Sequence, residues 1–308
     1  MRRVFASRII TPSTSAAAAE SRAGLIYGIV AYGLWGAMPL FFRQMAGVSP
    51  VEILAHRALW SFVFVALIVM AMGKLRVARA LLGDRKTLLL LVASTCFIAA
   101  NWLTYIYAVS THQVVQAGLG YFITPLANVL LGVVVLGERL RRLPLLALFV
   151  AAAGVVILSI HAGQAPWIAL LLAVTFSTYG LLRKLAATEA LVGLWIETTL
   201  LAPLAIGYLC YLESQGAGVF AFDANAQNGW LAATGPVTTA PLVCFAAAAR
   251  RLPMTALGFL QFITPTLQMG VAIFLFREPF TTAHAWAFAL IWTAVALYLF
   301  DILRRRGG

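Results

Sequence analysis

Ten apolar runs, each about 20 residues long, dominate this 308-residue sequence. A helix that crosses the roughly 30 Å hydrocarbon core of a bilayer needs about 20 such residues, because each residue rises about 1.5 Å. The runs lack the period-two alternation of a transmembrane barrel. The sequence therefore predicts an all-α polytopic membrane protein with ten transmembrane helices. They are expected at residues 23–44, 52–73, 87–109, 114–136, 143–162, 166–185, 191–212, 229–249, 254–276 and 283–303.

Composition excludes a water-soluble globule. Hydrophobic residues make up 62% of the chain and charged residues 10%, against roughly 45–50% and about 25% in soluble domains. The net charge of +12 is carried by short clusters between the apolar runs, with no stacking array of aromatic residues among them. This distribution is typical of membrane-flanking charges, so a nucleic-acid partner is not expected and the lipid bilayer is.

Lysine and arginine residues divide unequally between the two sides of the predicted bundle. Of the 22, 19 lie in the two tails and in alternate loops, Arg43 and Arg277 lie on the other side, and Arg57 lies within a run. Since positively charged loops stay in the cytoplasm, both termini are predicted to be cytoplasmic. Residues 1–22 are expected to form a disordered cytoplasmic tail, with a transit peptide as the alternative, and residues 304–308 a second tail.

The sequence contains an internal repeat. A shift of 140 residues aligns Phe122–Pro125 with Phe262–Pro265, Gly118 with Gly258, and Glu138 with Glu278. Chance similarity between Leu/Ala-rich helices is the alternative. The shift carries the fourth helix onto the ninth, so the unit has five helices, and an odd number makes successive copies cross in opposite directions. We therefore expect two inverted five-helix repeats, over residues 23–162 and 163–303.

Pro125 and Pro265 occupy equivalent places near the middle of the bilayer in the two copies. A proline removes a backbone donor and leaves the carbonyl four residues earlier without its helical partner. In transporters with inverted repeats, substrate sites lie near the midplane where helices are broken. Both prolines are therefore expected helix breaks, with a packing kink as the alternative.

Arg57 and Glu197 are also partners under the shift. An ionisable group in lipid costs a few kcal/mol, so such groups mark a pathway or a paired network. A direct bridge between the two is not expected, because their depths differ by about 13 Å along the membrane normal. Proton coupling through Glu197 stays open. The expected partners are Glu278 or Glu52 for Arg57, and Arg139, Lys184 or Arg250 for Glu197.

Other polar and aromatic side chains lie deep in the predicted helices. An apolar pocket with a few polar groups suits a small organic solute better than a bare ion. The candidates for substrate binding or the pathway are His56, Arg57, Trp60, Asn101, Trp102, Tyr105, Gln116, Tyr121, Glu197 and Gln261, and those for gating ion pairs are Glu52, Glu138 and Glu278. Asn128 and Gln268 are assigned to interhelical hydrogen bonds. No residues have metal-ligand spacing, so neither a metal nor a cofactor is expected.

Small residues line the first helix. Gly24 and Gly28 form a Gly-x-x-x-Gly, which Gly33 and Gly36 extend. This pattern allows helices to approach closely. Packing within the bundle is favoured over a homodimer face, which stays the alternative.

A set of short motifs runs through most of the chain: Ala31-Tyr32, Trp35-Gly36, Pro39, Glu52, His56-Arg57, Trp60-Ser61, Asn101-Trp102, Gly118 to Phe122, Glu138-Arg139, Tyr179-Gly180, Arg183-Lys184, Glu197-Thr198, Gly258 to Gln261, Pro265-Thr266 and Glu278-Pro279. As a set they resemble the RarD group of EamA-type permeases, in the drug/metabolite transporter superfamily, from about residue 24 to 303. Thr124 departs from the pattern, since Asn is expected before this proline. The resemblance implies a ten-helix bacterial inner-membrane protein with two EamA repeats that exports or exchanges metabolites or drug-like molecules.

The leading function is therefore a secondary transporter of a small organic solute, working by alternating access, with proton or solute counter-transport left open. No nucleotide-binding Gly-x-x-x-x-Gly-Lys-Ser/Thr loop occurs, so ATP is not the direct energy source. The alternatives are an intramembrane enzyme acting on a lipid-like substrate and a scaffold or receptor that transports nothing. The usual protease and hydrolase motifs are absent, so an enzyme is not expected.

Overall fold

The computed structural model describes residues 14–111, 113–161, 166–186, 188–220, 226–275, 277 and 281–306, and these are almost entirely helical. Ten helical segments in these ranges are long and apolar enough to cross a membrane. The α-helices are α1 (Thr14–Phe42), α2 (Pro50–Ala71), α3 (Leu75–Gly83), α4 (Arg85–Ser110), α5 (Val114–Val134), α6 (Arg142–His161), α7 (Trp167–Leu185), α8 (Ala190–Ser214), α9 (Ala226–Arg251), α10 (Met254–Gln261), α11 (Ile263–Gly270) and α12 (Thr282–Arg306). A 3-10 helix, η1 (Arg43–Met45), follows α1, and a π-helix, η2 (Val271–Leu275), follows α11.

The ten predicted transmembrane helices are confirmed, and α10, α11 and η2 together form the ninth. Three details differ from the prediction. The helix α1 begins at Thr14, so residues 14–22 are helical rather than a disordered tail, and α12 continues to Arg306 through most of the second expected tail. Residues 1–13, 307 and 308 lie outside the described residues. The predicted loop at 73–86 contains the short helix α3.

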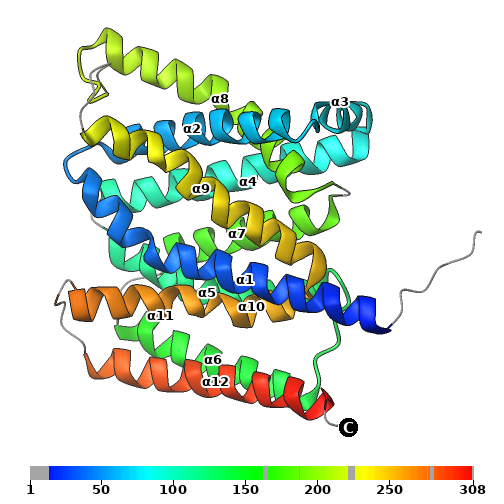
Figure 1. Ribbon diagram of the computed structural model, residues 1–308. Coiled ribbons are helices and arrows are strands. Elements are labelled where there is room, and N and C mark those ends of the chain that lie inside the picture. The colour runs from blue at the N-terminus through cyan, green and yellow to red at the C-terminus, as the bar shows by residue number, and fades with distance from the viewer. Residues whose placement is uncertain are drawn as a thin grey trace, which may run out of the picture.

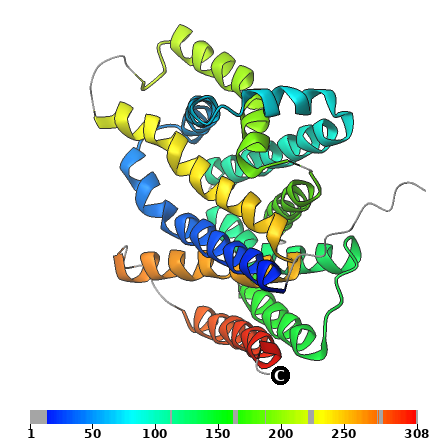
Figure 2. The same ribbon diagram turned by 45° about the vertical axis from the view of Figure 1, so that its right-hand side comes forward.

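The long helices run roughly alongside one another, and α1 begins on the same side of the bundle as α12 ends (Figure 1). We call this side the terminal face and the other side the opposite face. The helices α6 and α12 pack together along one edge of the bundle, as Figure 1 and Figure 2 both show, while α8 lies at the far edge against α2. Figure 2 also shows α1 and α9 packed side by side.

Helix positions follow the 140-residue shift. The starts of α2, α5 and α6, at residues 50, 114 and 142, fall on the starts of α8, α10 and α12, at residues 190, 254 and 282. Helix contacts also follow the shift, which relates α1 to α7, α4 to α9 and α5 to the α10–α11 segment. The helix α1 packs on α9 as α7 packs on α4, and α1 packs on α11 as α7 packs on α5. These correspondences are those of a five-helix repeat, whose inverted orientation stays a prediction.

Five rings fill the core where α1, α7 and α9 meet. We call Tyr32, Trp35, Phe176, Tyr179 and Phe245 the aromatic cluster. Phe245 is fully buried at its centre, with ring centroids 5.2 Å from Phe176, 5.7 Å from Trp35 and 6.0 Å from Tyr179. Tyr179 and Phe245 each lie six residues before the end of their helix, and both helices end at the terminal face. Tyr179 and Phe245 of the aromatic cluster therefore fill the half of the bundle nearer the terminal face.

The two midplane prolines have different local effects. The helix α5 runs through Pro125 without interruption, so the predicted break does not occur there. In the second copy the helix is interrupted at Phe262, between α10 and α11, and Pro265 follows three residues later. The Phe262 N–H bonds the Phe259 carbonyl, three residues back, which is a tighter turn than in an α-helix.

The glycines of the first helix face neighbouring helices of the same bundle. A Cβ added at Gly24 would lie 2.7 Å from the Cβ of Arg251, and one at Gly36 would lie 2.6 Å from the Cβ of Leu267. These positions therefore allow α1 to pack closely on α9 and α11, as favoured from the sequence.

Charged side chains hold the helix ends at the terminal face. The Glu138 carboxylate, from the turn after α5, accepts the backbone N–H of Met254 at 2.6 Å and both the N–H and the hydroxyl of Thr255, at 2.9 and 2.6 Å. It thus supplies the acceptor that the first turn of α10 lacks, and its charge suits a helix N-terminus. The Lys184 ammonium donates to the carbonyls of Ala249 and Leu252, at the end of α9.

Asp84 caps the start of α4 in the same way. The hydroxyl of Thr87 donates to its carboxylate at 2.6 Å, and the Lys86 N–H at 3.1 Å. The Thr87 hydroxyl, with the backbone donors, holds the pKa of Asp84 below its usual range. This carboxylate is therefore charged when it caps α4.

We expect Glu138→Ala to lower the free energy of unfolding by about 1–2 kcal/mol, because the start of α10 loses a charged acceptor. Unfolding of the purified protein in mixed micelles measures it. Glu213→Ala, which removes an exposed carboxylate at the end of α8, is the control and should change stability little. Equal stability of the two variants would show that Glu138 does not hold α10.

Candidate functional site

Arg57 lies at the eighth position of α2, which begins at the opposite face. Its Nε donates to the hydroxyl of Thr238 on α9 at 3.1 Å. The guanidinium carbon lies 5.3 Å from the ring centroid of Phe42 and 5.1 Å from that of Trp102. Cation–π contacts of this kind offset part of the cost of removing the cation from water.

The two terminal nitrogens of Arg57 make no hydrogen bond or ion pair with any residue that the structure describes. The side chain is only half-buried, as are those of Trp102, Tyr105 and Tyr121. Tyr105 and Tyr121 lie near the guanidinium. We call Arg57 with Phe42, Trp102, Tyr105 and Tyr121 the Arg57 site. It brings together four predicted site residues, and Phe42 is an addition.

His56 and Trp60 lie one turn apart on α2. His56 is 3% exposed, and neither of its ring nitrogens has a hydrogen-bond partner among the described residues. The Trp60 indole nitrogen is also buried without a partner there. The Phe220 ring covers both, with centroid distances of 5.0 Å to His56 and 6.1 Å to Trp60. Two predicted site residues thus lie together, beneath a residue that the sequence did not single out.

Glu197 is paired differently from the prediction. Its Oε1 lies 3.6 Å from Nη1 of Arg183, and both side chains are at most 2% exposed. The Ser94 hydroxyl donates to the same oxygen, and the Tyr179 hydroxyl lies beside the carboxylate. The prediction that Glu197 pairs with Arg139, Lys184 or Arg250 is therefore wrong. The partner is Arg183, which lies inside α7 rather than in the loop.

No ion pair joins Arg57 to Glu197 in the part of the chain that the structure describes, as their depths predict. Sequence reasoning missed Arg183, Ser94 and Thr238. The one sequence feature that could have indicated Arg183 is Gly193, which lies one turn before Glu197. A Cβ at this position would lie 2.9 Å from the guanidinium carbon of Arg183. The glycine leaves the space through which Arg183 reaches the carboxylate.

Two further predicted site residues bridge helices. The Asn101 amide donates to the Leu172 carbonyl at 2.9 Å and to the Thr175 hydroxyl at 3.0 Å. The Gln116 carbonyl accepts the N–H of Ile168 at the start of α7, at 3.2 Å. These bonds connect α4 and α5 with α7, so the two side chains help to hold the bundle.

The amide of Asn128 donates to Gln261 at 2.6 Å, where α5 crosses α10. Gln268 donates to the Trp35 carbonyl at 3.2 Å. The interhelical hydrogen bonds predicted for Asn128 and Gln268 are therefore confirmed, and Gln261 belongs to the first of them.

Two of the three gating candidates, Glu52 and Glu138, lie within the described residues and accept backbone N–H groups. Glu52 accepts the backbone N–H of Val219 at 2.7 Å, and Glu138 caps α10. Neither makes an ion pair within the described ranges. Glu278 lies outside the described residues, so its expected pairing with Arg57 stays a prediction.

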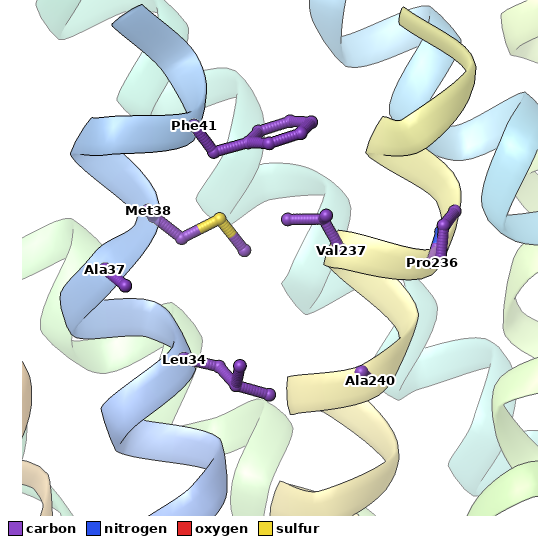
Figure 3. A pocket seen from close by; sticks show the side chains of 7 residues that line it. All are labelled: Leu34, Ala37, Met38, Phe41, Pro236, Val237 and Ala240. Carbon is purple, nitrogen blue, oxygen red and sulfur yellow. The ribbon is translucent and has the colours of Figure 1, made fainter. Parts of the chain in front are cut away.

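Two apolar pockets open between the helices. The first, of about 310 Å³, lies between α1 and α9, where the side chains of Met38, Phe41 and Val237 point toward one another (Figure 3). The second, of about 230 Å³, lies between α2, α4 and α8 and includes Trp102. Leu204, which lines it, is 72% exposed, so this pocket opens at the bundle surface.

Breaking the buried pair at Glu197 should be costly. We expect Glu197→Gln or Arg183→Met alone to lower the free energy of unfolding by about 3–5 kcal/mol, because each leaves a buried charge uncompensated. The double variant should recover most of this loss. Unfolding in mixed micelles measures all three, and additive losses in the double variant would contradict a buried pair.

The comparisons with known proteins agree with this architecture. Residues 22–160 match the model of the EamA-like transporter family. An uncharacterized transporter of Pseudomonas aeruginosa is 43% identical over 288 residues, which are 94% of this chain and 97% of the relative. Protein RarD of Streptomyces exfoliatus is 41% identical, over 92% of this chain and 90% of the relative, and Protein RarD of Escherichia coli is 38% identical, over 93% and 97%.

One solved crystal structure superimposes on this fold with a TM-score of 0.68. It covers 92% of this chain and 98% of its own, at 21% sequence identity. At this identity the likeness concerns the fold alone. With ten candidate spans and relatives of high coverage, the chain is a multi-pass bacterial membrane protein that belongs to the RarD group of the EamA-like transporter family.

Proposed function

We propose that this protein is a secondary transporter of a small organic solute and works by alternating access between two inverted halves, residues 23–162 and 163–303. Both termini lie on the cytoplasmic side of a bacterial inner membrane in this proposal, because the sequence assigns 19 of the 22 lysine and arginine residues to the tails and to the loops on the same side. The solute binds at the Arg57 site. The family and the names of the relatives support transport and specify no substrate.

Unequal packing at two equivalent glycines carries the proposal. A Cβ at Gly258 would lie 2.6 Å from the carbonyl oxygen of Pro125 and 2.8 Å from Val129 Cγ2. At Gly118, the partner under the repeat, no described atom lies within 4 Å of such a Cβ. The helix α5 thus packs tightly on α10 near the terminal face, whereas space remains at Gly118 near the opposite face. Two related halves that exchange conformations would exchange these packings.

The Arg57 site and the aromatic cluster support the same direction of opening. Arg57 and Tyr121 each lie seven residues, about 10 Å of helix, from a helix start at the opposite face. Their side chains remain partly exposed, whereas Phe245 in the aromatic cluster is fully buried. A solute would therefore reach Arg57 from the opposite face, and the aromatic cluster would block its passage to the terminal face.

The family model supports the division into halves. It matches residues 22–160, nearly the same residues as the predicted first repeat, 23–162. The second half has equivalent helix starts. A repeated family unit in which each copy has five helices is the arrangement that alternating access needs.

A transport experiment distinguishes this function from the alternatives. Liposomes that contain the purified protein are loaded with a bacterial metabolite extract, and the released solutes are identified by mass spectrometry against protein-free liposomes. Saturable release of an unchanged solute supports transport. Release of a chemically altered solute would indicate an enzyme, and release equal to the protein-free liposomes would indicate a scaffold or receptor.

Gly118→Leu should abolish transport without loss of stability. The present packing leaves space at Gly118, but the exchanged packing would bring it against the region of Pro265, as Gly258 now meets Pro125. The added side chain would block that second conformation. Initial rates in the liposome assay and unfolding in mixed micelles measure the two effects.

Gly207→Leu is the matched control, because Gly207 is an exposed helical glycine of α8 with no described atom within 4 Å of its Cβ position. It should transport normally. Normal transport by Gly118→Leu as well would rule out the exchange of equivalent packings.

A further inference from the structure

We propose that the solute is an organic carboxylate with an apolar body of aromatic size, whose carboxylate binds the two terminal nitrogens of Arg57. This inference rests on the proposed transport function, since it makes the ligand of the Arg57 site the transported solute. It adds the chemical class, which neither the family nor the names of the relatives specify.

The first step is the donor capacity that Arg57 leaves unused. The Thr238 hydroxyl accepts a hydrogen bond only from Nε of Arg57, and the two terminal nitrogens have no partner among the described residues. These nitrogens form a planar fork whose two N–H groups match the two oxygens of a carboxylate. A charged group this deep in a membrane protein is costly without a partner. A bound carboxylate supplies both the hydrogen bonds and the opposite charge.

The repeat explains why no described residue of the first half supplies an anion there. The 140-residue shift places Arg57 on Glu197 and Arg43 on Arg183. In the second half these positions form the buried Glu197–Arg183 pair. In the first half both positions are arginines, so the equivalent pair cannot form. The contacted helices are equivalent, since Glu197 meets Ser94 on α4 and Arg57 meets Thr238 on α9, although the shift places Ser94 on Thr234. The first half therefore keeps the position but lacks the counter-charge.

The rings around Arg57 determine the rest of the ligand. Phe42 and Trp102 lie over the guanidinium, and Tyr105 and Tyr121 complete the site. Four aromatic side chains favour an apolar body over a strongly hydrated inorganic anion. The single cation balances one negative charge, which fits a monocarboxylate better than a phosphate dianion. A cationic solute would meet repulsion from the guanidinium.

The test compares two ligands of nearly equal size on the purified wild-type protein. We expect 3-phenylpropionate to bind at least roughly tenfold more tightly than 3-phenylpropanamide, because only the carboxylate forms a charge-assisted pair with Arg57. Inorganic phosphate should not compete. Tryptophan fluorescence, with Trp102 beside the site, and calorimetry measure binding. Equal affinity for the acid and the amide, or no binding of either, would overturn the proposal.

Variants then locate the effect. Arg57→Gln should remove the preference for the acid, and Arg57→Lys should retain part of it because the charge remains. Arg43→Gln removes an exposed cation near the same face and should leave the preference intact. Preserved preference in Arg57→Gln would contradict the assignment. If Arg57→Gln does not fold, the acid and amide affinities of the wild-type protein and of Arg57→Lys still test the assignment, because both proteins keep the positive charge.

The proposal and the transport function fail in different ways. Labelled 3-phenylpropionate and the metabolite extract are both tested in the liposome assay. Movement of neutral or cationic solutes, without acid preference at Arg57, would leave transport standing and reject the carboxylate. Acid binding that depends on Arg57, with no movement of any solute, would leave the anion site standing and reject transport.

Discussion

Lipid offers no hydrogen-bond partner to a buried polar group, and this constraint organises the whole bundle. Hydroxyl side chains inside the described helices often bond a carbonyl of their own helix, as Thr124 does, whereas several amide and charged side chains bond other helices. Asn128 meets Gln261 across the α5–α10 crossing, Asn101 meets α7, and Glu197 meets both Arg183 and Ser94. Each of these bonds also fixes which helices are neighbours. Satisfaction of polar groups and specificity of packing are therefore the same requirement in this protein.

Buried polar atoms without a described partner occur on several helices, including Tyr32 on α1, Trp195 on α8 and Thr239 on α9, but they cluster on α2. Arg57 keeps two donor nitrogens without a described partner, and His56 and Trp60 keep buried nitrogens without one. All three lie within five residues of α2, near the opposite face. A buried donor without a partner costs roughly 1–3 kcal/mol or more. For Arg57 on this helix, we propose that the missing partner is the bound solute.

The sequence predicted the architecture well because hydrophobic length and charge asymmetry are local signals. Each of the ten spans depends on its own 20 or so residues, so none of them required knowledge of the packing. The partner of Glu197 was not predictable in the same way. It depends on how far the Arg183 side chain reaches from the last turn of α7, and on the space at Gly193 that admits it. The missed helix α3 is short and amphipathic, so a search for long apolar runs passes over it.

The repeat also shows why similar halves need not be equivalent in energy. Backbone positions follow the 140-residue shift, but the chemistry at them does not: Glu197 falls on Arg57, and Phe245 of the aromatic cluster falls on Tyr105 of the Arg57 site. If the halves exchange packings, the aromatic cluster would have to open while its less aromatic equivalents close. The two conformations would then bury different side chains, and their free energies would differ. A ligand that neutralises Arg57 changes this difference only as far as it binds one conformation more tightly than the other. The asymmetry between the halves, rather than their likeness, would therefore decide which face is open when the site is empty.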